Sequence, residues 1–273
     1  MIKFVIDSTG YLPQEMLAEY DITVVPLSCF VENREYREGL PGTFEPIYED
    51  AERSKVIPRT SLPSTQAFVD AFEKILSNGD EVICLTLAST LSGTNNNARL
   101  ATEMTSAPDK ISVIDSGSAA QTIQLYMEEL LKLAGAGKTR QEIVEMFPEI
   151  QSRGGVAFVP ETLENLRRGG RISMLSATLG NVLKIKPILM FQSGVLKCAK
   201  KAIGDLKAVL ALVETIPKEA KKIIVLRISQ SQFFENVKKA VKQHFPAAIM
   251  LEGDVGPVIG AHIGRAFGAC WIC

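Results

Sequence analysis

The stretch Glu-Val-Ile-Cys-Leu-Thr-Leu-Ala-Ser-Thr-Leu-Ser-Gly-Thr, residues 81–94, joins a short apolar run directly to a turn rich in hydroxyl groups. Residues 81–87 are typical of a buried strand, and a helix is expected to follow the turn, to about residue 105. The same order occurs at residues 2–6 and 111–114, where apolar runs end at Asp7-Ser8-Thr9-Gly10 and Asp115-Ser116. This alternation predicts an α/β fold with a mainly parallel sheet flanked by helices on both faces.

Other patterns in the first half complete this unit. The clearest helix is expected at residues 64–77, where Ser64 can cap the first turn and Phe68, Phe72 and Ile75 share one face. Further helices are expected at 12–20, at 123–134 and, as a short element, from Thr139; a strand is expected at 22–25, a hairpin at 29–37 and a loop at 59–61.

The composition shifts at residues 151–155, and this shift predicts a domain boundary there. We therefore expect two α/β domains, an N-terminal one at residues 1–152 and a C-terminal one at 153–273. The C-terminal domain is expected to hold helices at 161–168, 206–213 and 234–241, an apolar segment at 179–191 that leads to a hairpin at Ser193-Gly194, and strands at 223–228, 247–251 and 267–272.

Charge and composition exclude several classes of protein. The 273 residues carry 30 Lys+Arg against 31 Asp+Glu, which argues against a broad electrostatic surface for nucleic acid. The five cysteines are odd in number and dispersed, as is typical of reduced thiols in the cytoplasm. The chain reaches Asp7 too soon for a signal peptide, and its longest near-apolar stretch, 256–273, contains Pro257 and Arg265. A soluble cytoplasmic protein without integral membrane association is expected.

Motifs of common catalytic sites are absent from the sequence. It has no Gly-x-x-x-x-Gly-Lys-Ser/Thr, no Gly-x-Gly-x-x-Gly after a strand and no Gly-x-Ser-x-Gly. Two histidines and dispersed cysteines make a zinc site improbable. No metal and no cofactor are therefore expected, and no catalytic residues are assigned.

Hydroxyl-bearing residues mark the expected binding site. Ligands of open parallel sheets bind beyond the carboxyl ends of the strands. Ser92 lies at such an end, and the neighbouring Gly93 allows close approach of backbone N–H groups, which favours contact with an anionic oxygen. For Asp7 and Asp115, capping of the following helices is favoured over ligand binding. His262, among glycines and apolar residues, is more typical of a core residue than of a catalyst.

Six short motifs, in order along the chain, together resemble the DegV family of bacterial fatty-acid-binding proteins. They are Val-Ile-Asp-Ser-Thr at 5–9, Arg-Thr-Ser-Leu-Pro-Ser at 59–64, Leu-Ser-Gly-Thr at 91–94, Val-Ile-Asp-Ser at 113–116, Leu-Arg-Arg-Gly-Gly-Arg-Ile-Ser at 166–173 and Gly-Pro-Val-Ile-Gly-Ala-His-Ile-Gly at 256–264. Each motif is weak alone, but six in the family's order make chance similarity improbable.

The resemblance implies a long-chain fatty acid, bound between the two domains and presented to a separate fatty acid kinase. The kinase would form an acyl phosphate for phospholipid synthesis, and the chain itself would be a lipid-binding carrier and not an enzyme. By the same resemblance, the carboxylate is held by Thr60, Ser92 and the backbone of Gly93. Arg171, His262, Ser61 and Thr94 are expected in the head-group region.

Two alternatives to this function stay open, and the chain departs from the family pattern after Gly264. Ser92 and His262, oriented by Asp7 or Asp115, would suit a serine hydrolase or acyltransferase. The Gly169-Gly170-Arg171 loop would suit a sensor of small anions. Where the family usually continues with Pro-Gly-Ala after Gly264, this chain has Arg265-Ala266-Phe267, which adds a charge near His262.

Overall fold

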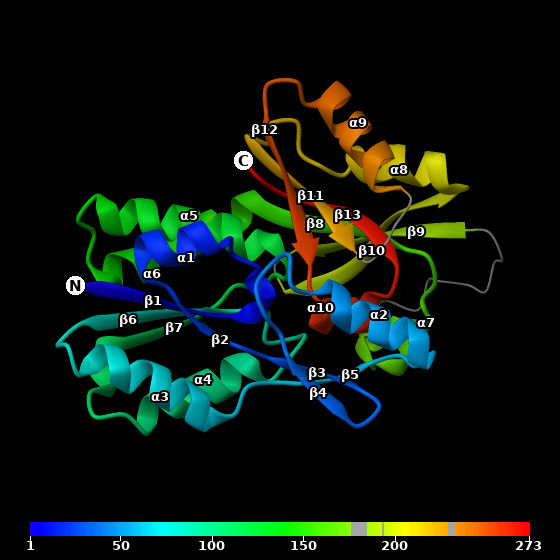
Figure 1. Cartoon of the computed structure of the whole chain (residues 1–273). Coiled ribbons are helices and arrows are strands. Elements are labelled where there is room, and N and C mark those ends of the chain that lie inside the picture. The colour runs from blue at the N-terminus through cyan, green and yellow to red at the C-terminus, as the bar shows by residue number, and fades with distance from the viewer. Residues whose placement is uncertain (176–184, 193, 229–232) are drawn as a thin grey trace.

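The computed structural model describes residues 1–175, 185–192, 194–228 and 233–273, which form two larger sheets and one small sheet (Figure 1). The first larger sheet is wholly parallel, with the strand order β2-β1-β6-β7. Its strands are β1 (Ile2–Asp7), β2 (Thr23–Val25), β6 (Glu81–Thr86) and β7 (Ile111–Asp115). All four carboxyl ends therefore point the same way, toward the second half of the chain (Figure 1).

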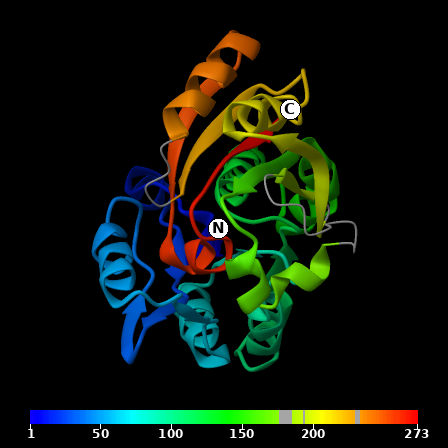
Figure 2. The same cartoon turned by 90° about the vertical axis from the view of Figure 1, so that its right-hand side faces the viewer.

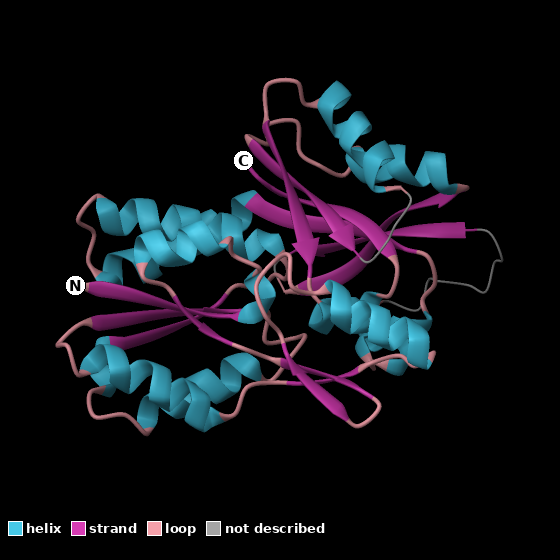
Figure 3. Cartoon of the chain, in the orientation of Figure 1, coloured by secondary structure: helices cyan, strands magenta, loops and turns pink. Residues whose placement is uncertain are grey.

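Helices cover both faces of this sheet, because its strands carry apolar residues on both sides (Figure 3). Val5 and Cys84 pack with α3 (Thr65–Leu76) and α4 (Thr94–Glu103), whereas Ile6 and Leu85 pack with α5 (Gln121–Gly135) and α6 (Arg140–Arg153). The expected fold class of this half is confirmed. Two shorter helices, η1 (Ser8–Gly10) and α1 (Gln14–Tyr20), follow β1, and η2 (Pro108–Lys110) precedes β7.

The second larger sheet is mixed, with the order β10-β9-β8-β13-β11-β12. Only β11 and β12 pair in parallel among its described neighbours. Its strands are β8 (Gly154–Pro160), β9 (Ile185–Gln192), β10 (Val195–Ile203), β11 (Lys222–Ile228), β12 (Ile249–Val255) and β13 (Ala266–Ile272). Helices α8 (Asp205–Val213) and α9 (Phe234–His244) pack on one face, and the other face turns toward the first half (Figure 1).

The small sheet and the remaining helices lie beside the junction of the two halves. The small sheet has the antiparallel order β4-β3-β5, with β3 (Ser28–Val31), β4 (Arg34–Arg37) and β5 (Arg59–Ser61). The helices are α2 (Glu45–Ser54), α7 (Glu164–Arg168), η3 (Arg171–Met174) and α10 (Pro257–Ile263). In Figure 2, α10 (red) lies near the middle of the molecule, between α9 (orange) and α3 (cyan).

Several expected elements are corrected. Residues 59–61 form a strand and not a loop, because β3 supplies hydrogen bonds to this segment. The expected helix at 161–168 begins only at Glu164, and the strand expected at 247–251 runs from Ile249 to Val255. Helices α2 and α10 were not expected, and residues 179–184 of the apolar segment lie outside the described residues. The hairpin at 29–37 is confirmed by the β3–β4 pairing. The strands on either side of the hairpin expected at 193–194 pair in antiparallel fashion, but residue 193 lies outside the described residues. The domain boundary between 152 and 153 stays a prediction.

Candidate functional site

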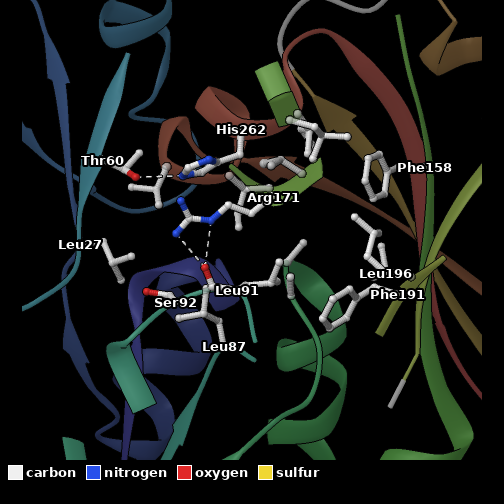
Figure 4. Close-up of a pocket in the computed structure, with 18 of the residues that line it drawn as sticks. Leu27, Thr60, Leu87, Leu91, Ser92, Phe158, Arg171, Phe191, Leu196 and His262 are labelled. Atoms are coloured by element: carbon white, nitrogen blue, oxygen red, sulfur yellow. Dashed lines mark hydrogen bonds between the residues drawn. The ribbon is translucent and has the colours of Figure 1, made fainter. Parts of the chain in front are cut away.

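A cavity lies where the carboxyl ends of the parallel strands face the six-stranded sheet (Figure 4). The volume of this cavity is about 160 Å³. On the same measure a single water molecule requires roughly 10–15 Å³, so the cavity is more than ten times larger. The lining comprises Leu27, Thr60, Ser61, Leu62, Leu87, Leu91, Ser92, Ala119, Ala120, Val156, Phe158, Leu166, Arg171, Phe191, Leu196, Leu226, Ile228, Val255, Val258, Ile259, His262 and Ile263.

The polar lining residues come from four different elements. Thr60 lies on β5, Ser92 in the turn between β6 and α4, Arg171 on η3 and His262 on α10. In Figure 4, Thr60, Ser92, Arg171 and His262 lie on the side opposite Phe158, Phe191 and Leu196. The structure thus brings together residues far apart in sequence at one polar end of the cavity, which we term the mouth. The other described lining residues are apolar, apart from Ser61.

His262 joins the two halves of the chain at the mouth. Its Nε2 lies 2.9 Å from the Thr60 hydroxyl, while its Nδ1 is buried and has no hydrogen-bond partner among the described residues. Burial, and to a smaller extent the Arg171 charge, lowers the pKa of His262 from 6.5 to about 4. The ring is therefore neutral near pH 7, so only one of its nitrogens carries a proton.

Arg171 binds backbone carbonyls across the mouth. Its Nε and Nη2 donate to the Leu91 oxygen at 3.1 and 2.8 Å, and its Nη1 donates to the Gly169 oxygen at 2.6 Å. These bonds fix the turn that precedes Ser92 against η3. The guanidinium nonetheless contributes its positive charge to the mouth, as its effect on His262 shows.

The Ser92 turn presents hydroxyl and backbone donors. The Ser92 and Thr94 hydroxyls lie 2.9 Å apart, and Thr94 itself is fully buried at the start of α4. In the described part of the chain, the Gly93 N–H has no acceptor. Ser61 follows Thr60 on β5 and is exposed at the rim, with its hydroxyl bonded to the Leu62 oxygen.

Asp7 and Asp115 serve the turns that follow their strands. Asp7 accepts the Thr9 N–H at 2.9 Å and the Leu87 N–H at 2.6 Å, and Asp115 accepts the Gly117 N–H at 2.8 Å. Burial raises the pKa of Asp7 in spite of these bonds. Neither carboxylate contacts His262 in the described structure, and His262 bonds to Thr60 instead of Ser92. The expected helix-capping role is confirmed for Asp7, which caps η1, and is wrong for Asp115, because α5 has Ala120 at its N-cap and Asp115 bonds within a turn. The described residues do not assemble the hydrogen-bonded Ser–His–Asp chain of a hydrolase.

The position of α10 depends on a buried carboxylate, Glu38, that sequence reasoning missed. Glu38 is 3% exposed, and it accepts hydrogen bonds from the Ser8 hydroxyl at 2.6 Å, the Val258 N–H at 2.9 Å and the Tyr11 hydroxyl at 3.2 Å. Burial outweighs these bonds and raises its pKa from 4.5 to about 7. Pro257 could have indicated the start of α10 in the sequence, because proline favours the first turn of a helix. No sequence pattern indicated that Glu38 contacts this helix.

Arg265, the departure from the family pattern, lies away from the mouth. Its guanidinium pairs with Glu52 on α2 at 2.6 Å, and it lines a second, more open cleft between α2 and α10. Its charge is thus neutralised by a partner on α2, and it is absent from the lining of the first cavity.

No helix among the described residues is both long enough and apolar enough to cross a membrane. No group of three or more His, Cys, Asp or Glu side chains among them is placed to hold a metal ion.

Comparisons with known proteins agree over the whole chain. A family model described as an uncharacterised protein of the DegV family matches residues 1–273. A DegV domain-containing protein of Halalkalibacterium halodurans is 31% identical over 277 residues, covering 99% of this chain and 98% of that protein.

Two solved structures have the same fold. The crystal structure of DegV from Bacillus subtilis, described as a fatty acid binding protein, is 28% identical with a TM-score of 0.88, and covers 99% of this chain and 98% of that one. A fatty-acid-binding DegV family protein from Thermus thermophilus is 28% identical with a TM-score of 0.86, and covers 99% of both chains.

A methyl group at Gly169 is expected to displace His262. A Cβ there would overlap His262 Nδ1, and the backbone cannot recede because the same Cβ would lie 3.1 Å from the Asn165 oxygen. In Gly169→Ala the ring should therefore move toward solvent, and its pKa should rise from about 4 toward 6.5. NMR titration of the imidazole measures this, with His244→Gln to distinguish the two histidines.

Gly135→Ala is the matched control for this substitution, because a Cβ at Gly135 on α5 meets nothing within 4 Å. An unchanged His262 titration in both variants would show that Gly169 does not position the ring.

Glu38 should make the protein more stable at mildly acidic pH. Because its folded pKa of about 7 lies above the ordinary 4.5, the folded state binds the proton more tightly, and stability falls as pH rises through this window. Between about pH 5 and about pH 8, Glu38 should lower the free energy of unfolding by on the order of 3 kcal/mol.

The measurement is the difference between the wild type and Glu38→Gln in denaturant unfolding across this range. His262 acts in the opposite direction, since its pKa is lowered, but it is common to both proteins and cancels in the difference. Parallel stability curves would contradict the assignment of the titration to Glu38.

Proposed function

Because the chain belongs to the DegV family, we propose that it binds a long-chain fatty acid, with the carboxylate at the mouth and the tail in the apolar cavity. The observation that carries this proposal is the distribution of polarity in one cavity. The polar side chains of its described lining are Thr60, Ser61, Ser92, Arg171 and His262, and the rest of the lining is apolar. An amphipathic ligand with one polar end fits this distribution.

Thr60 and Ser92 are the direct ligands of the carboxylate in this proposal, together with the Gly93 N–H. A buried carboxylate is tolerated only when it accepts hydrogen bonds, and each bond to a charged acceptor contributes roughly 1.5–3 kcal/mol. Thr60 and Ser92 each offer a hydroxyl, and Gly93 offers a backbone N–H. Arg171 supplies positive potential in this proposal, while three of its five N–H groups bind the Leu91 and Gly169 carbonyls.

The proton of His262 decides whether Thr60 can donate to the ligand. With the proton on Nε2, the ring donates to the Thr60 oxygen, and the Thr60 hydroxyl is free to donate to a carboxylate. With the proton on Nδ1, the Thr60 hydroxyl must donate to Nε2 instead. The Nε2–H form also avoids leaving a buried N–H unpaired at Nδ1, which has no partner among the described residues. His262 thus acts by orienting Thr60.

The tail supplies most of the affinity. Each buried methylene contributes roughly 0.8 kcal/mol, so a tail of about 15 carbons offers on the order of 10 kcal/mol before the cost of association. The lining suits this role because it draws Leu, Ile, Val and Phe from both halves of the chain.

We also propose that the chain is a carrier and that a separate fatty acid kinase phosphorylates the bound acid. The sequence has no glycine-rich phosphate-binding motif of its own, which supports a nucleotide site on another protein. The resulting acyl phosphate would serve phospholipid synthesis. In this proposal the protein acts in the cytoplasm without a cofactor or metal, and the ligand lies between domains at residues 1–152 and 153–273.

Removing either hydroxyl anchor should weaken binding of the acid. Ser92→Ala and Thr60→Ala are each expected to raise the Kd of a long-chain acid by roughly 10-fold to 100-fold, equivalent to about 1–3 kcal/mol. Isothermal titration with the delipidated protein measures this. The fatty alcohol of the same length is the matched ligand control, because it lacks the charge that the hydroxyl groups stabilise.

Lipid extracted from the freshly purified protein provides an independent test. We expect a co-purified fatty acid, and an increase in Tm when acid is added back to the delipidated chain. The proposal fails if no acid co-purifies or binds. Ester hydrolysis that disappears in Ser92→Ala would support the hydrolase alternative instead.

A further inference from the structure

Side chains from three adjacent strands form the end of the cavity opposite the mouth. On β8 and β9, Val156 lies opposite Phe191, and on β9 and β10, Phe191 lies opposite Leu196. Phe158 follows Val156 by two residues, so it projects from the same face of the sheet. All four are buried and line the cavity. We term them the end wall; Figure 4 shows three of them on the far side of the cavity from Thr60.

The sheet behind the end wall cannot recede. Residues on its opposite face, among them Ala157, Val159 and Ile188, pack in a separate core with α8 and α9. The six-stranded sheet therefore forms a hydrogen-bonded layer between that core and the cavity. The depth of the cavity is consequently fixed by the size of the end-wall side chains and not by movement of the backbone.

No polar side chain of the described lining belongs to the end wall. Val156 and Phe191 lie on central strands of the sheet, which are paired on both sides, so their backbone N–H and C=O groups are used in strand pairing. A hydroxyl or carboxyl group at the far end of a ligand would lose its hydrogen bonds to water and find none in return.

We propose that the end wall sets the chain length of the bound acid and selects ligands whose far end is an unmodified methyl group. This inference rests on the proposed function and deepens it by naming the residues that define the ligand class. The mouth recognises the charged end, and the end wall rejects a second polar end and limits length.

A series of saturated acids of increasing length tests the length limit. For the wild type, affinity should rise about fourfold per added carbon, the equivalent of roughly 0.8 kcal/mol, until the methyl end reaches the wall, and then level off or fall. In Phe191→Ala and Leu196→Ala this break should move to longer acids, and affinity for the first acid beyond the wild-type break should rise at least about fourfold.

Leu212→Ala is the matched control, because Leu212 on α8 is fully buried in the core on the opposite side of the same sheet. It creates a comparable cavity outside the lining and should leave the break unchanged. Thermal unfolding of each variant establishes that it is folded, and Phe191→Leu provides a milder change at the same position.

A second experiment tests the rejection of a polar far end by comparing an acid with its ω-hydroxy analogue of the same length. The wild type should bind the analogue at least about tenfold more weakly, because the buried hydroxyl is left unpaired. Leu196→Ser supplies a partner and should reduce this discrimination relative to Leu196→Ala, which opens similar space without one.

The outcomes separate this inference from the proposed function. If the wild type binds no acid at any length, the proposed function is refuted and the inference with it. The inference alone is overturned if acids bind but the length at which affinity stops rising is unchanged in Phe191→Ala, Phe191→Leu and Leu196→Ala. It is also overturned if the wild type binds the acid and its ω-hydroxy analogue equally well.

Discussion

Glu38 accepts the Val258 N–H at the start of α10, and the cavity depends on this contact. The helix supplies both polar and apolar lining: His262 at the mouth, and Val258, Ile259 and Ile263 along the side. Two further contacts from the first half of the chain hold this helix and the end of β12 that precedes it. The Tyr48 hydroxyl donates to the Val255 oxygen at 2.8 Å, and a Cβ at Gly260 would overlap Tyr48, so a glycine is required for this close approach.

This docking explains how two separate halves make one site. The parallel sheet presents the Ser92 turn at its carboxyl end, as expected for this class of fold. The small sheet presents Thr60, and α10 returns from near the end of the chain to meet it. The buried carboxylate has no cationic partner among the described residues, and its raised pKa reflects the cost of its burial. Above about pH 7 the protein therefore carries an unfavourable buried charge at the contact that positions the mouth.

The sequence predicted the elements whose information is local. The parallel sheet followed from apolar runs that end in Asp-Ser, and α3 followed from Ser64 and the spacing of Phe68 and Phe72, because capping and periodicity are read within a few residues. Helix α10 was missed because its glycines obscure helical periodicity, and β5 because three residues gain strand structure only from their partner β3.

The residues of the candidate site also differ in whether a local sequence pattern could identify them. Ser92 and Gly93 were recognisable from their place after a strand, whereas Thr60, Arg171 and His262 entered through family resemblance. Their geometry depends on contacts over long separations, such as Thr60 with His262 and Arg171 with Leu91, which no local pattern encodes. The end wall is equally non-local, because it exists only through the register of β8, β9 and β10.

A crystal structure of the delipidated protein soaked with one long-chain saturated acid would show where the ligand lies and which way it points. We expect continuous ligand density along the cavity, with the carboxylate within hydrogen-bond distance of the Thr60 and Ser92 hydroxyls and the terminal methyl against Phe191 and Leu196. Density with the opposite orientation, or a cavity that stays empty while the acid binds elsewhere, would contradict this expectation.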